Sequence, residues 1–223
     1  MKKIFILIPA YNEEKMIDQV IAEVKKEGFK NIIVVDDGST DKTKEKAEKA
    51  GAMVLSHLFN RGKGAAIKTG IEFLKQIDFD YLITIDGDGQ HNVKDIKKVV
   101  EKLKDGYQVV LGNRFLKKNQ MPFFNRLGNF LANILTYLVY GLWVGDSQSG
   151  FRGYNKKALD KLDLSSDQYE FDSEVIREIA YHQLKFCEVP IDVFYTSYST
   201  SKRHKQNLIN GIKTMIRLFI NNS

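Results

Sequence analysis

The stretch Tyr81-Leu-Ile-Thr-Ile-Asp86-Gly-Asp88-Gly-Gln90-His91 decides the fold of this chain. It begins as a short apolar run, typical of a buried strand, and ends in two carboxylates separated by one small residue. Residues two apart point the same way in an extended chain, so we expect Asp86, Asp88 and Gln90 to converge. Their hard oxygens suit Mg²⁺ or Mn²⁺ and leave coordination positions open for diphosphate oxygens. The stretch therefore predicts a strand that ends in a metal site; the simpler alternative is a turn solubilised by two aspartates.

The rest of the chain repeats an alternation of strand and helix. Apolar, β-branched runs predict buried strands at 4–8, 32–35, 53–56, 81–85, 109–111 and 188–191. Between them, apolar residues at three- and four-residue spacing predict helices, as at Ile17, Val20, Ile21 and Val24. This order predicts an α/β fold with an open, mostly parallel sheet flanked by helices.

Composition limits the classes of protein to which the chain can belong. With 223 residues, of which 43% are hydrophobic and 28% charged, it is long enough for one substantial core. The net charge of +6 favours anionic partners. A single cysteine, Cys187, excludes an internal disulfide and suggests a reducing compartment. Because Pro9 interrupts the first apolar run, we interpret that run as a core strand and expect a cytoplasmic protein.

Acidic residues follow three of the predicted strands. Glu13 follows the first strand, Asp36 and Asp37 the second, and Asp86 and Asp88 the fourth. Such ends meet at one edge of a parallel sheet, where the charges repel one another unless a cation or hydrogen-bond donors lie between them. The pattern predicts a ligand site in which Asp36 or Asp37 accepts hydrogen bonds from a ribose or a base. The alternative is that Asp36 is a turn or helix-cap residue.

The segment Asn60-Arg-Gly-Lys63-Gly-Ala-Ala opens a predicted helix. Backbone N–H groups at a helix start, together with Lys63, are suited to holding a phosphate. The segment lacks the spacing of a P-loop, and its glycines follow the third strand rather than the first, which argues against a dinucleotide-binding fingerprint.

Five motifs, in this order along the chain, resemble those of family 2 glycosyltransferases of the GT-A fold. They are Pro9-Ala-Tyr-Asn-Glu13, Val35-Asp-Asp-Gly-Ser-Thr-Asp41, Gly62-Lys-Gly64, Asp86-Gly-Asp-Gly-Gln-His91 and Asp146-Ser-Gln-Ser-Gly-Phe-Arg152. The likeness covers about residues 3–200 and is greatest to dolichyl-phosphate mannosyltransferases and related polyprenyl-phosphate sugar transferases. It implies an inverting, metal-dependent transfer of a hexose from a nucleotide-sugar, of the GDP-mannose or UDP-glucose type, to a polyprenyl phosphate. It also implies site residues: Pro9, Tyr11, Glu13, Asp37 and Lys63 for the nucleotide-sugar, and Asp86, Asp88 and Gln90 for the metal and diphosphate.

The resemblance also implies an acceptor site. Arg114 and Arg126 match arginines that meet the lipid phosphate, a role that suits a guanidinium because it can bind phosphate oxygens bidentately. Arg203 lies in a cationic stretch, 198–205, that is expected to close over a phosphate; a solvated linker is the alternative. We assign residues 1–204 to the GT-A domain and 205–223 to a C-terminal amphipathic helix.

The segment 122–144 within that domain is apolar, but polar residues interrupt it on one helical stripe, at Asn129, Asn133 and Thr136. We therefore predict a helix that lies on a membrane or packs on the core rather than spanning a bilayer. The expected location is peripheral, on the cytoplasmic face of a membrane. A small integral-membrane protein is a further candidate partner, because many relatives continue into transmembrane helices.

The acceptor determines which catalytic groups are needed. A phosphate monoester is largely ionised at neutral pH, since its second pKa is about 6, and attacks without a general base. If the acceptor is instead a sugar hydroxyl of a polysaccharide or glycolipid, a carboxylate must take its proton, and Asp146 is the candidate.

Two other classes of protein fit the sequence less well. An aspartyl-phosphate phosphatase carries its D-x-D after the first strand, which here ends in Pro9-Ala-Tyr-Asn-Glu13. A nucleic-acid-binding module is disfavoured because the lysines are scattered along helix faces rather than interleaved with aromatic residues.

Overall fold

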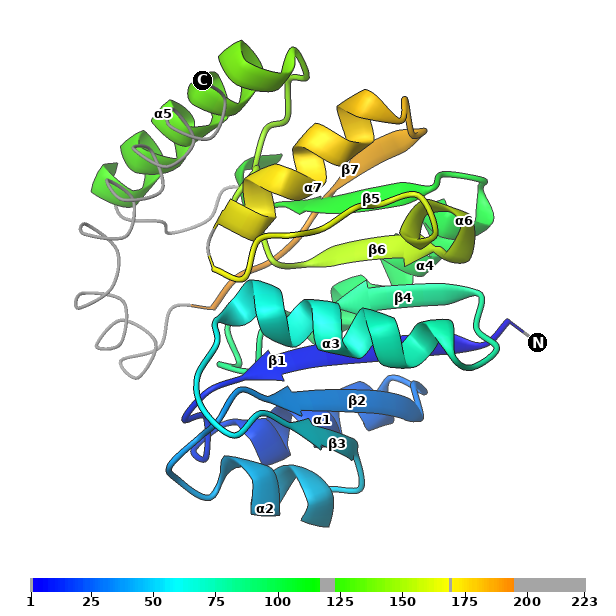
Figure 1. Cartoon of the computed structure of the whole chain (residues 1–223), viewed down its shortest axis with the longest axis vertical. Helices are drawn as coiled ribbons and strands as arrows, with labels where there is room; N and C mark the ends of the chain where they lie inside the picture. Colours follow the sequence, from blue (N-terminus) through cyan, green and yellow to red (C-terminus); the bar gives the residue numbers. More distant parts are fainter. Residues whose placement is uncertain (1, 117–122, 169, 195–223) are drawn as a thin grey trace.

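The computed structural model describes residues 2–116, 123–168 and 170–194, which form a seven-stranded sheet with helices on both faces (Figure 1). The strands are β1 (Ile4–Ala10), β2 (Asn31–Asp36), β3 (Met53–Ser56), β4 (Tyr81–Thr84), β5 (Val109–Asn113), β6 (Arg152–Asn155) and β7 (Phe186–Pro190). The helices are α1 (Ile17–Lys26), α2 (Thr43–Lys49), α3 (Lys63–Lys75), α4 (Ile96–Lys104), α5 (Phe123–Tyr140), α6 (Lys156–Leu159) and α7 (Glu170–Tyr181). A short 3-10 turn, η1 (Val93–Asp95), precedes α4, and another, η2 (Arg114–Leu116), follows β5.

The sheet is open and mostly parallel, in the order β3-β2-β1-β4-β6-β5-β7, which confirms the predicted fold class. β6 is the exception, because it runs antiparallel to both of its neighbours, β4 and β5. The sequence did not indicate this strand, since Arg152-Gly-Tyr-Asn contains no apolar run. Its reversed direction brings Arg152, its first residue, to the edge of the sheet where the parallel strands end.

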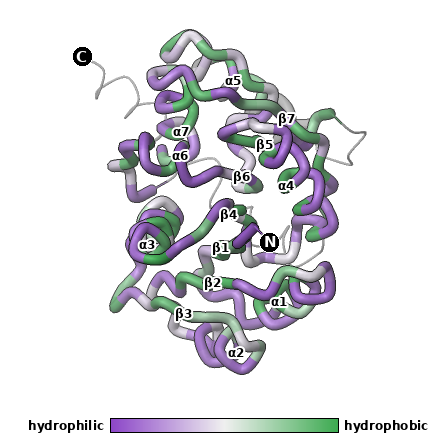
Figure 2. The backbone as a smooth tube through the Cα atoms, turned by 90° about the vertical axis from the view of Figure 1, so that its right-hand side faces the viewer, coloured by the Kyte–Doolittle hydropathy of each residue, from purple (hydrophilic) through white to green (hydrophobic). Residues whose placement is uncertain are grey.

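Alternating side chains of the strands fill two separate cores. In β1, Ile6 and Ile8 pack on the face covered by α1 and α4, whereas Leu7 packs on the face covered by α3 and α7. Figure 2 shows the sheet between these two helical layers. Close approach on both faces depends on glycines. A Cβ on Gly70 of α3 would lie 2.3 Å from Leu7 Cδ1, and one on Gly153 of β6 would lie 2.2 Å from a methyl of Val99.

The predicted helices agree with the structure to within a few residues. The helix predicted to open in the segment 60–66 is α3, and the amphipathic segment expected at 122–144 contains α5. In the part of the chain that the structure describes, no helix combines the length and the apolar character needed to cross a bilayer. The predicted C-terminal helix, 205–223, lies outside that part.

Candidate active site

The two central carboxylates lie at the carboxyl end of β4, beside the end of β1. Two glycines lie in this turn, where the chain runs close to its neighbours. A Cβ on Gly87 would already touch Ile8 and Pro9 of β1, and one on Gly89, where φ is +73°, would lie 2.5 Å from Met16 Cε. The chain between Asp86 and Gln90 therefore turns tightly against β1, as expected for a ligand site at the edge of a parallel sheet.

Asp86 is partly buried between two nitrogen-bearing side chains. Lys63 Nζ lies 2.9 Å from its Oδ1, and His91 Nε2 lies 3.1 Å from its Oδ2. Burial alone would raise the pKa of the Asp86 carboxyl, but Lys63 and His91 hold that pKa well below its ordinary value. Asp86 is thus ionised at neutral pH, and Lys63 from the first turn of α3 acts as its counter-ion.

Asp88 lies next to this pair and has the opposite pKa shift. Burial and the negative charge of Asp86 raise the pKa of the Asp88 carboxyl. Its two oxygens accept hydrogen bonds from Gln90, from the backbone N–H at 3.0 Å and from the side-chain Nε2 at 2.5 Å. Gln90 therefore lies with the two carboxylates, but turns its amide nitrogen toward Asp88, and its role as a metal ligand stays a prediction.

These residues fit a divalent cation by their chemistry. No cluster of three or more His, Cys, Asp or Glu side chains suited to a metal is found among the described residues, so the donors would be Asp86 and Asp88, completed by other groups. Carboxylate oxygens are the ligands that Mg²⁺ and Mn²⁺ prefer, and a cation would offset the repulsion that raises the pKa of Asp88.

A chain of charges leads from Asp86 into the protein. Lys63 Nζ lies 3.9 Å from Asp172 Oδ2, and Arg152 Nη2 lies 3.1 Å from Asp172 Oδ1. Burial alone would lower the pKa of the Lys63 ammonium, but Asp172 and Asp86 raise it above its ordinary value. Arg152 is 2% exposed and also donates to the backbone carbonyl oxygens of Ser147 and Ser149. This network fixes Lys63 at the site and ties it to the loop that precedes β6.

Asp37 holds the segment that carries Lys63. Its Oδ1 accepts a hydrogen bond from the Arg61 N–H at 2.9 Å, and its Oδ2 accepts one from the Gly62 N–H at 2.7 Å. His57 Nδ1 lies 2.6 Å from the same Oδ1, and His57 Nε2 lies 2.8 Å from Thr69 Oγ1. Because both oxygens already have partners within the protein, contact between Asp37 and a nucleoside stays a prediction.

The remaining candidates for the nucleotide-sugar lie at the ends of β1 and β2. Pro9 belongs to β1, Tyr11 follows it with a side chain that is 40% exposed, and the Glu13 N–H donates to Thr43 Oγ1 at 2.7 Å. Asp36 accepts a hydrogen bond from the Ser39 N–H at 3.3 Å, which is the turn-capping role given above as the alternative.

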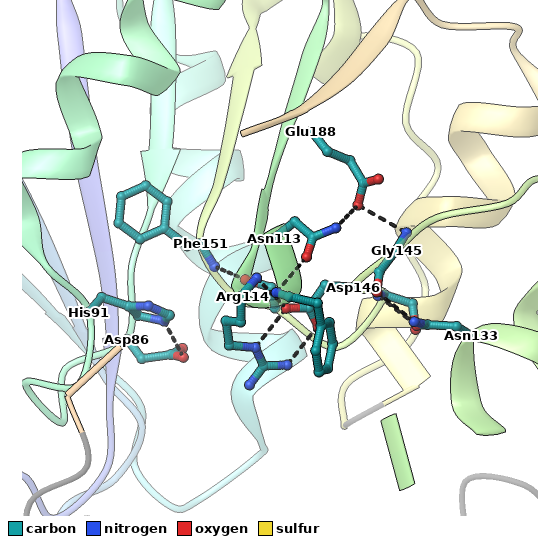
Figure 3. Close-up of polar contacts among 12 residues, drawn as sticks. Asp86, His91, Asn113, Arg114, Asn133, Gly145, Asp146, Phe151 and Glu188 are labelled. Atoms are coloured by element: carbon teal, nitrogen blue, oxygen red, sulfur yellow. Dashed lines mark hydrogen bonds and ion pairs between the residues drawn. The ribbon is translucent and has the colours of Figure 1, made fainter. Parts of the chain in front are cut away.

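Asp146 and Arg114 form a buried pair on the other side of the site (Figure 3). Arg114 donates to Asp146 Oδ2 from Nε at 2.7 Å and from its backbone N–H at 3.0 Å, and to Oδ1 from Nη2 at 2.7 Å. The Asp146 side chain is completely buried. The structure thus brings together two residues that the sequence assigned to different roles, one as a candidate base and the other as a phosphate ligand.

The loop 145–151 connects this pair to the central carboxylates. At its far end, a Cβ on Gly150 would lie 2.3 Å from Lys63 Nζ and 2.7 Å from Asp86 Oδ1, so the backbone passes directly beside them. At its near end, Glu188 Oε1 accepts hydrogen bonds from the Gly145 N–H and from Asn113 Nδ2, both at 3.0 Å. The sequence does not reveal these contacts, because Glu188 and Asn113 lie on strands far apart in the chain.

Comparison with known proteins decides the family. The chain matches the model of glycosyl transferase family 2 over residues 5–163. An uncharacterised protein of Methanocaldococcus jannaschii is 47% identical, over 98% of this chain and 91% of that protein. The UDP-N-acetylglucosamine–dolichyl-phosphate N-acetylglucosaminyltransferase of Methanococcus voltae is 35% identical, over 98% of this chain and 96% of that protein.

The chain belongs to glycosyl transferase family 2. Its fold is also that of the crystal structure of Mycobacterium tuberculosis glucosyl-3-phosphoglycerate synthase in complex with Mn²⁺, UDP and glucosyl-3-phosphoglycerate. The TM-score is 0.69 at 20% identity, covering 95% of this chain and 78% of that one. The resemblance read from the five motifs, the GT-A fold and the assignment as a glycosyltransferase are thereby confirmed.

The α5 helix of this family 2 transferase buries polar side chains and exposes apolar ones. Its described polar residues, Asn133 and Thr136, are 4% and 2% exposed. Its exposed side instead carries large apolar side chains, which continue into the turn that follows, at Phe130, Leu131, Tyr137, Leu138, Val139 and Trp143. A surface helix normally buries its apolar side, so this arrangement is inverted.

Two predicted acceptor residues are not described in this transferase. The side chain of Arg126, in the first turns of α5, and the whole of Arg203 lie outside the described part of the chain. Their proposed contacts with a lipid phosphate stay predictions.

Sequence reasoning gave no role to His91. The available signal for His91 was its position directly after Gln90 in the Asp86–His91 motif.

Proposed function

We propose that the chain transfers a hexose, with inversion, from a nucleotide-sugar to a polyprenyl phosphate, using Mg²⁺ or Mn²⁺. The observation that carries this proposal is the state of Asp146. Its carboxylate is completely buried and is bound by three N–H donors of Arg114. A carboxylate that is fully buried, with both oxygens bound to Arg114, does not face an acceptor hydroxyl from which it could take a proton.

An acceptor that needs no general base fits this arrangement. A phosphate monoester has a second pKa of about 6 and is largely ionised at neutral pH. Its oxygen attacks the anomeric carbon directly while the bond from that carbon to the diphosphate oxygen breaks, so the configuration inverts. In this proposal Arg114 binds the acceptor phosphate, and Asp146 orients the guanidinium.

The donor is assigned to the opposite side of the site. A divalent cation held by Asp86 and Asp88 would offset the charge that develops on the departing nucleoside diphosphate. Lys63, which lies 2.9 Å from Asp86 Oδ1, is proposed to donate hydrogen bonds to the same diphosphate. Pro9, Tyr11 and Glu13, at the end of β1, are the proposed nucleoside contacts.

The inverted helix α5 supports a lipid acceptor. Its exposed apolar side matches a polyprenyl chain or the apolar part of a membrane surface better than it matches water. Asn133 joins this helix to the loop that carries Asp146. The Methanococcus voltae relative that is 35% identical is named for transfer to dolichyl phosphate, which agrees with this acceptor. We therefore propose that the enzyme works peripherally on the cytoplasmic face of a membrane, where a small integral-membrane protein is a candidate partner.

The test is transfer of sugar into the organic phase. The purified protein is incubated with Mn²⁺ or Mg²⁺, a panel of labelled GDP- and UDP-sugars, and either a polyprenyl phosphate or the matching polyprenol. We expect one donor to label the polyprenyl phosphate and none to label the polyprenol. Labelling of the polyprenol, or transfer only to a saccharide hydroxyl, would reject the proposed acceptor.

A further inference from the structure

We propose that Asn133 is a positioning residue that couples the exposed apolar face of α5 to the Asp146–Arg114 pair. This inference rests on the proposed function, because it assumes that the apolar face receives the lipid chain of the acceptor. It concerns a polar side chain on the buried face of a helix whose opposite face is apolar.

Asn133 binds the backbone on both sides of Asp146. Its Nδ2 donates to the carbonyl oxygen of Gly145 at 2.6 Å. Its Oδ1 accepts hydrogen bonds from the Ser147 N–H at 3.0 Å and from Ser147 Oγ at 2.8 Å. One side chain thereby fixes the residues before and after Asp146, and Figure 3 shows it approaching the loop from α5.

The other side of Asp146 is fixed by the sheet. Gly145 also donates its N–H to Glu188 of β7, and the Asp146 carboxylate binds Arg114 beyond the end of β5. Those strands are held by the sheet and cannot move independently of it. Asn133 is a side-chain link from the loop to α5, in addition to the short chain segment 141–144 that connects them, so a shift of this helix changes the backbone at 145 and 147 and with it the orientation of Asp146.

The chemistry of this position requires an amide. The site needs one donor for the Gly145 carbonyl and one acceptor for the two Ser147 donors, and an asparagine side chain supplies both. Asn133 is 4% exposed, so if its amide were removed, the Gly145 carbonyl and the Ser147 donors would lose these hydrogen bonds without water to replace them.

The helix joins this buried amide to the apolar face. Leu138 is 71% exposed and lies five residues after Asn133, which places it roughly 140° away around a helix of about 3.6 residues per turn. The two side chains therefore lie on different sides of α5, and any dependence of one on the other must pass through movement of the helix itself.

The experiment is a double-mutant cycle on transfer to the polyprenyl phosphate, with Asn133→Ala and Leu138→Ser. We expect each single substitution to lower kcat at saturating lipid about tenfold, and the double variant to lower it by about the same factor. The KM for the nucleotide-sugar stays unchanged in all three. Leu58→Ser is the matched control, because Leu58 is 99% exposed on the loop after β3, and it should leave kcat unchanged.

A purely structural role for Asn133 predicts a different result. The two effects would then multiply to about a hundredfold loss, which would overturn the inference. If Asn133→Ala does not fold, Ser147→Ala takes its place in the cycle, because it removes only the contact of the Ser147 hydroxyl with Asn133. We then expect Ser147→Ala alone to lower kcat about threefold, and its effect is again compared with and without Leu138→Ser. A wild-type protein that transfers no sugar to the lipid would reject the proposed function itself, whereas transfer with multiplicative losses would reject only the coupling.

Discussion

Replacement of Lys63 by methionine tests whether its ammonium is the counter-ion of the central carboxylates. Lys63 Nζ lies 2.9 Å from Asp86 Oδ1 and 3.9 Å from Asp172 Oδ2. Removing one partner of a fully buried ion pair costs about 3–5 kcal/mol. Water screens part of this interaction, because the side chains of Lys63 and Asp86 are 24% and 30% exposed. We therefore expect Lys63→Met to lower the free energy of unfolding by about 2 kcal/mol.

A divalent cation should recover part of that loss. In the wild-type protein a cation approaching Asp86 must compete with the ammonium, whereas in Lys63→Met it meets a carboxylate that has lost this competing charge. If the variant binds Mn²⁺ about tenfold more tightly, saturating Mn²⁺ stabilises it by about 1.4 kcal/mol more than it stabilises the wild type. Urea denaturation of both proteins, with and without Mn²⁺ and without nucleotide, measures this difference.

The matched control is Lys68→Met, on the same helix. The Lys68 side chain is 21% exposed, nearly the same as that of Lys63, but its partner Asp167 is 42% exposed. An ion pair with such an exposed partner contributes less than about 1 kcal/mol, and Mn²⁺ should not change the effect of its loss. Equal destabilisation by the two substitutions, or an Mn²⁺ response of Lys63→Met identical to that of the wild type, would refute the counter-ion role.

Three further predictions concern single side chains. Asp88→Asn should reduce metal-dependent sugar transfer at least about a hundredfold without lowering the urea midpoint, because it removes a metal ligand and a repelling charge together; transfer at the wild-type rate would exclude Asp88 as a ligand. Burial alone would raise the pKa of the Glu174 carboxyl, but hydrogen bonds from Ser165 and neighbouring donors lower that pKa below its ordinary value of 4.5. Its stabilising effect is therefore present above that pH and is lost as the pH falls, so the stability difference between wild type and Glu174→Gln should shrink between pH 7 and pH 3 in urea titrations; a difference independent of pH would contradict this. Gly153→Ala should lower the free energy of unfolding by about 1–3 kcal/mol, because its Cβ would lie 2.2 Å from Val99 Cγ1, and an unchanged midpoint would mean that α4 moves away freely.

Local patterns in the sequence were sufficient for most of the fold. Strands such as β1 and β2 are apolar runs buried on both faces, and the apolar positions of α1 recur with the helical period, so each is visible within a short window. The acidic residues Asp86 and Asp88 are equally local, because they directly follow a buried strand. Since the carboxyl ends of parallel strands meet at one edge, the sequence also predicted that these residues would lie beside the end of β1.

β6 could not be predicted in this way. Arg152 and Tyr154 are almost completely buried although neither belongs to an apolar run, and Arg152 donates hydrogen bonds to the carbonyl oxygens of Ser147 and of Asp172, which lies on α7. Whether a polar segment becomes a central strand depends on those distant partners, and a short window does not contain them.

The sequence by itself determined the alternation of strand and helix, the edge at which the carboxylates gather, and the family. Only the tertiary structure decided how those side chains are paired. It paired Asp146 with Arg114, and it turned Asn133 inward from a helix whose apolar side chains face out. The physical reason is that a periodic pattern reports which side chains share a face, whereas a hydrogen bond or ion pair depends on distances of about 3 Å between residues far apart in the chain, which only the packed fold sets.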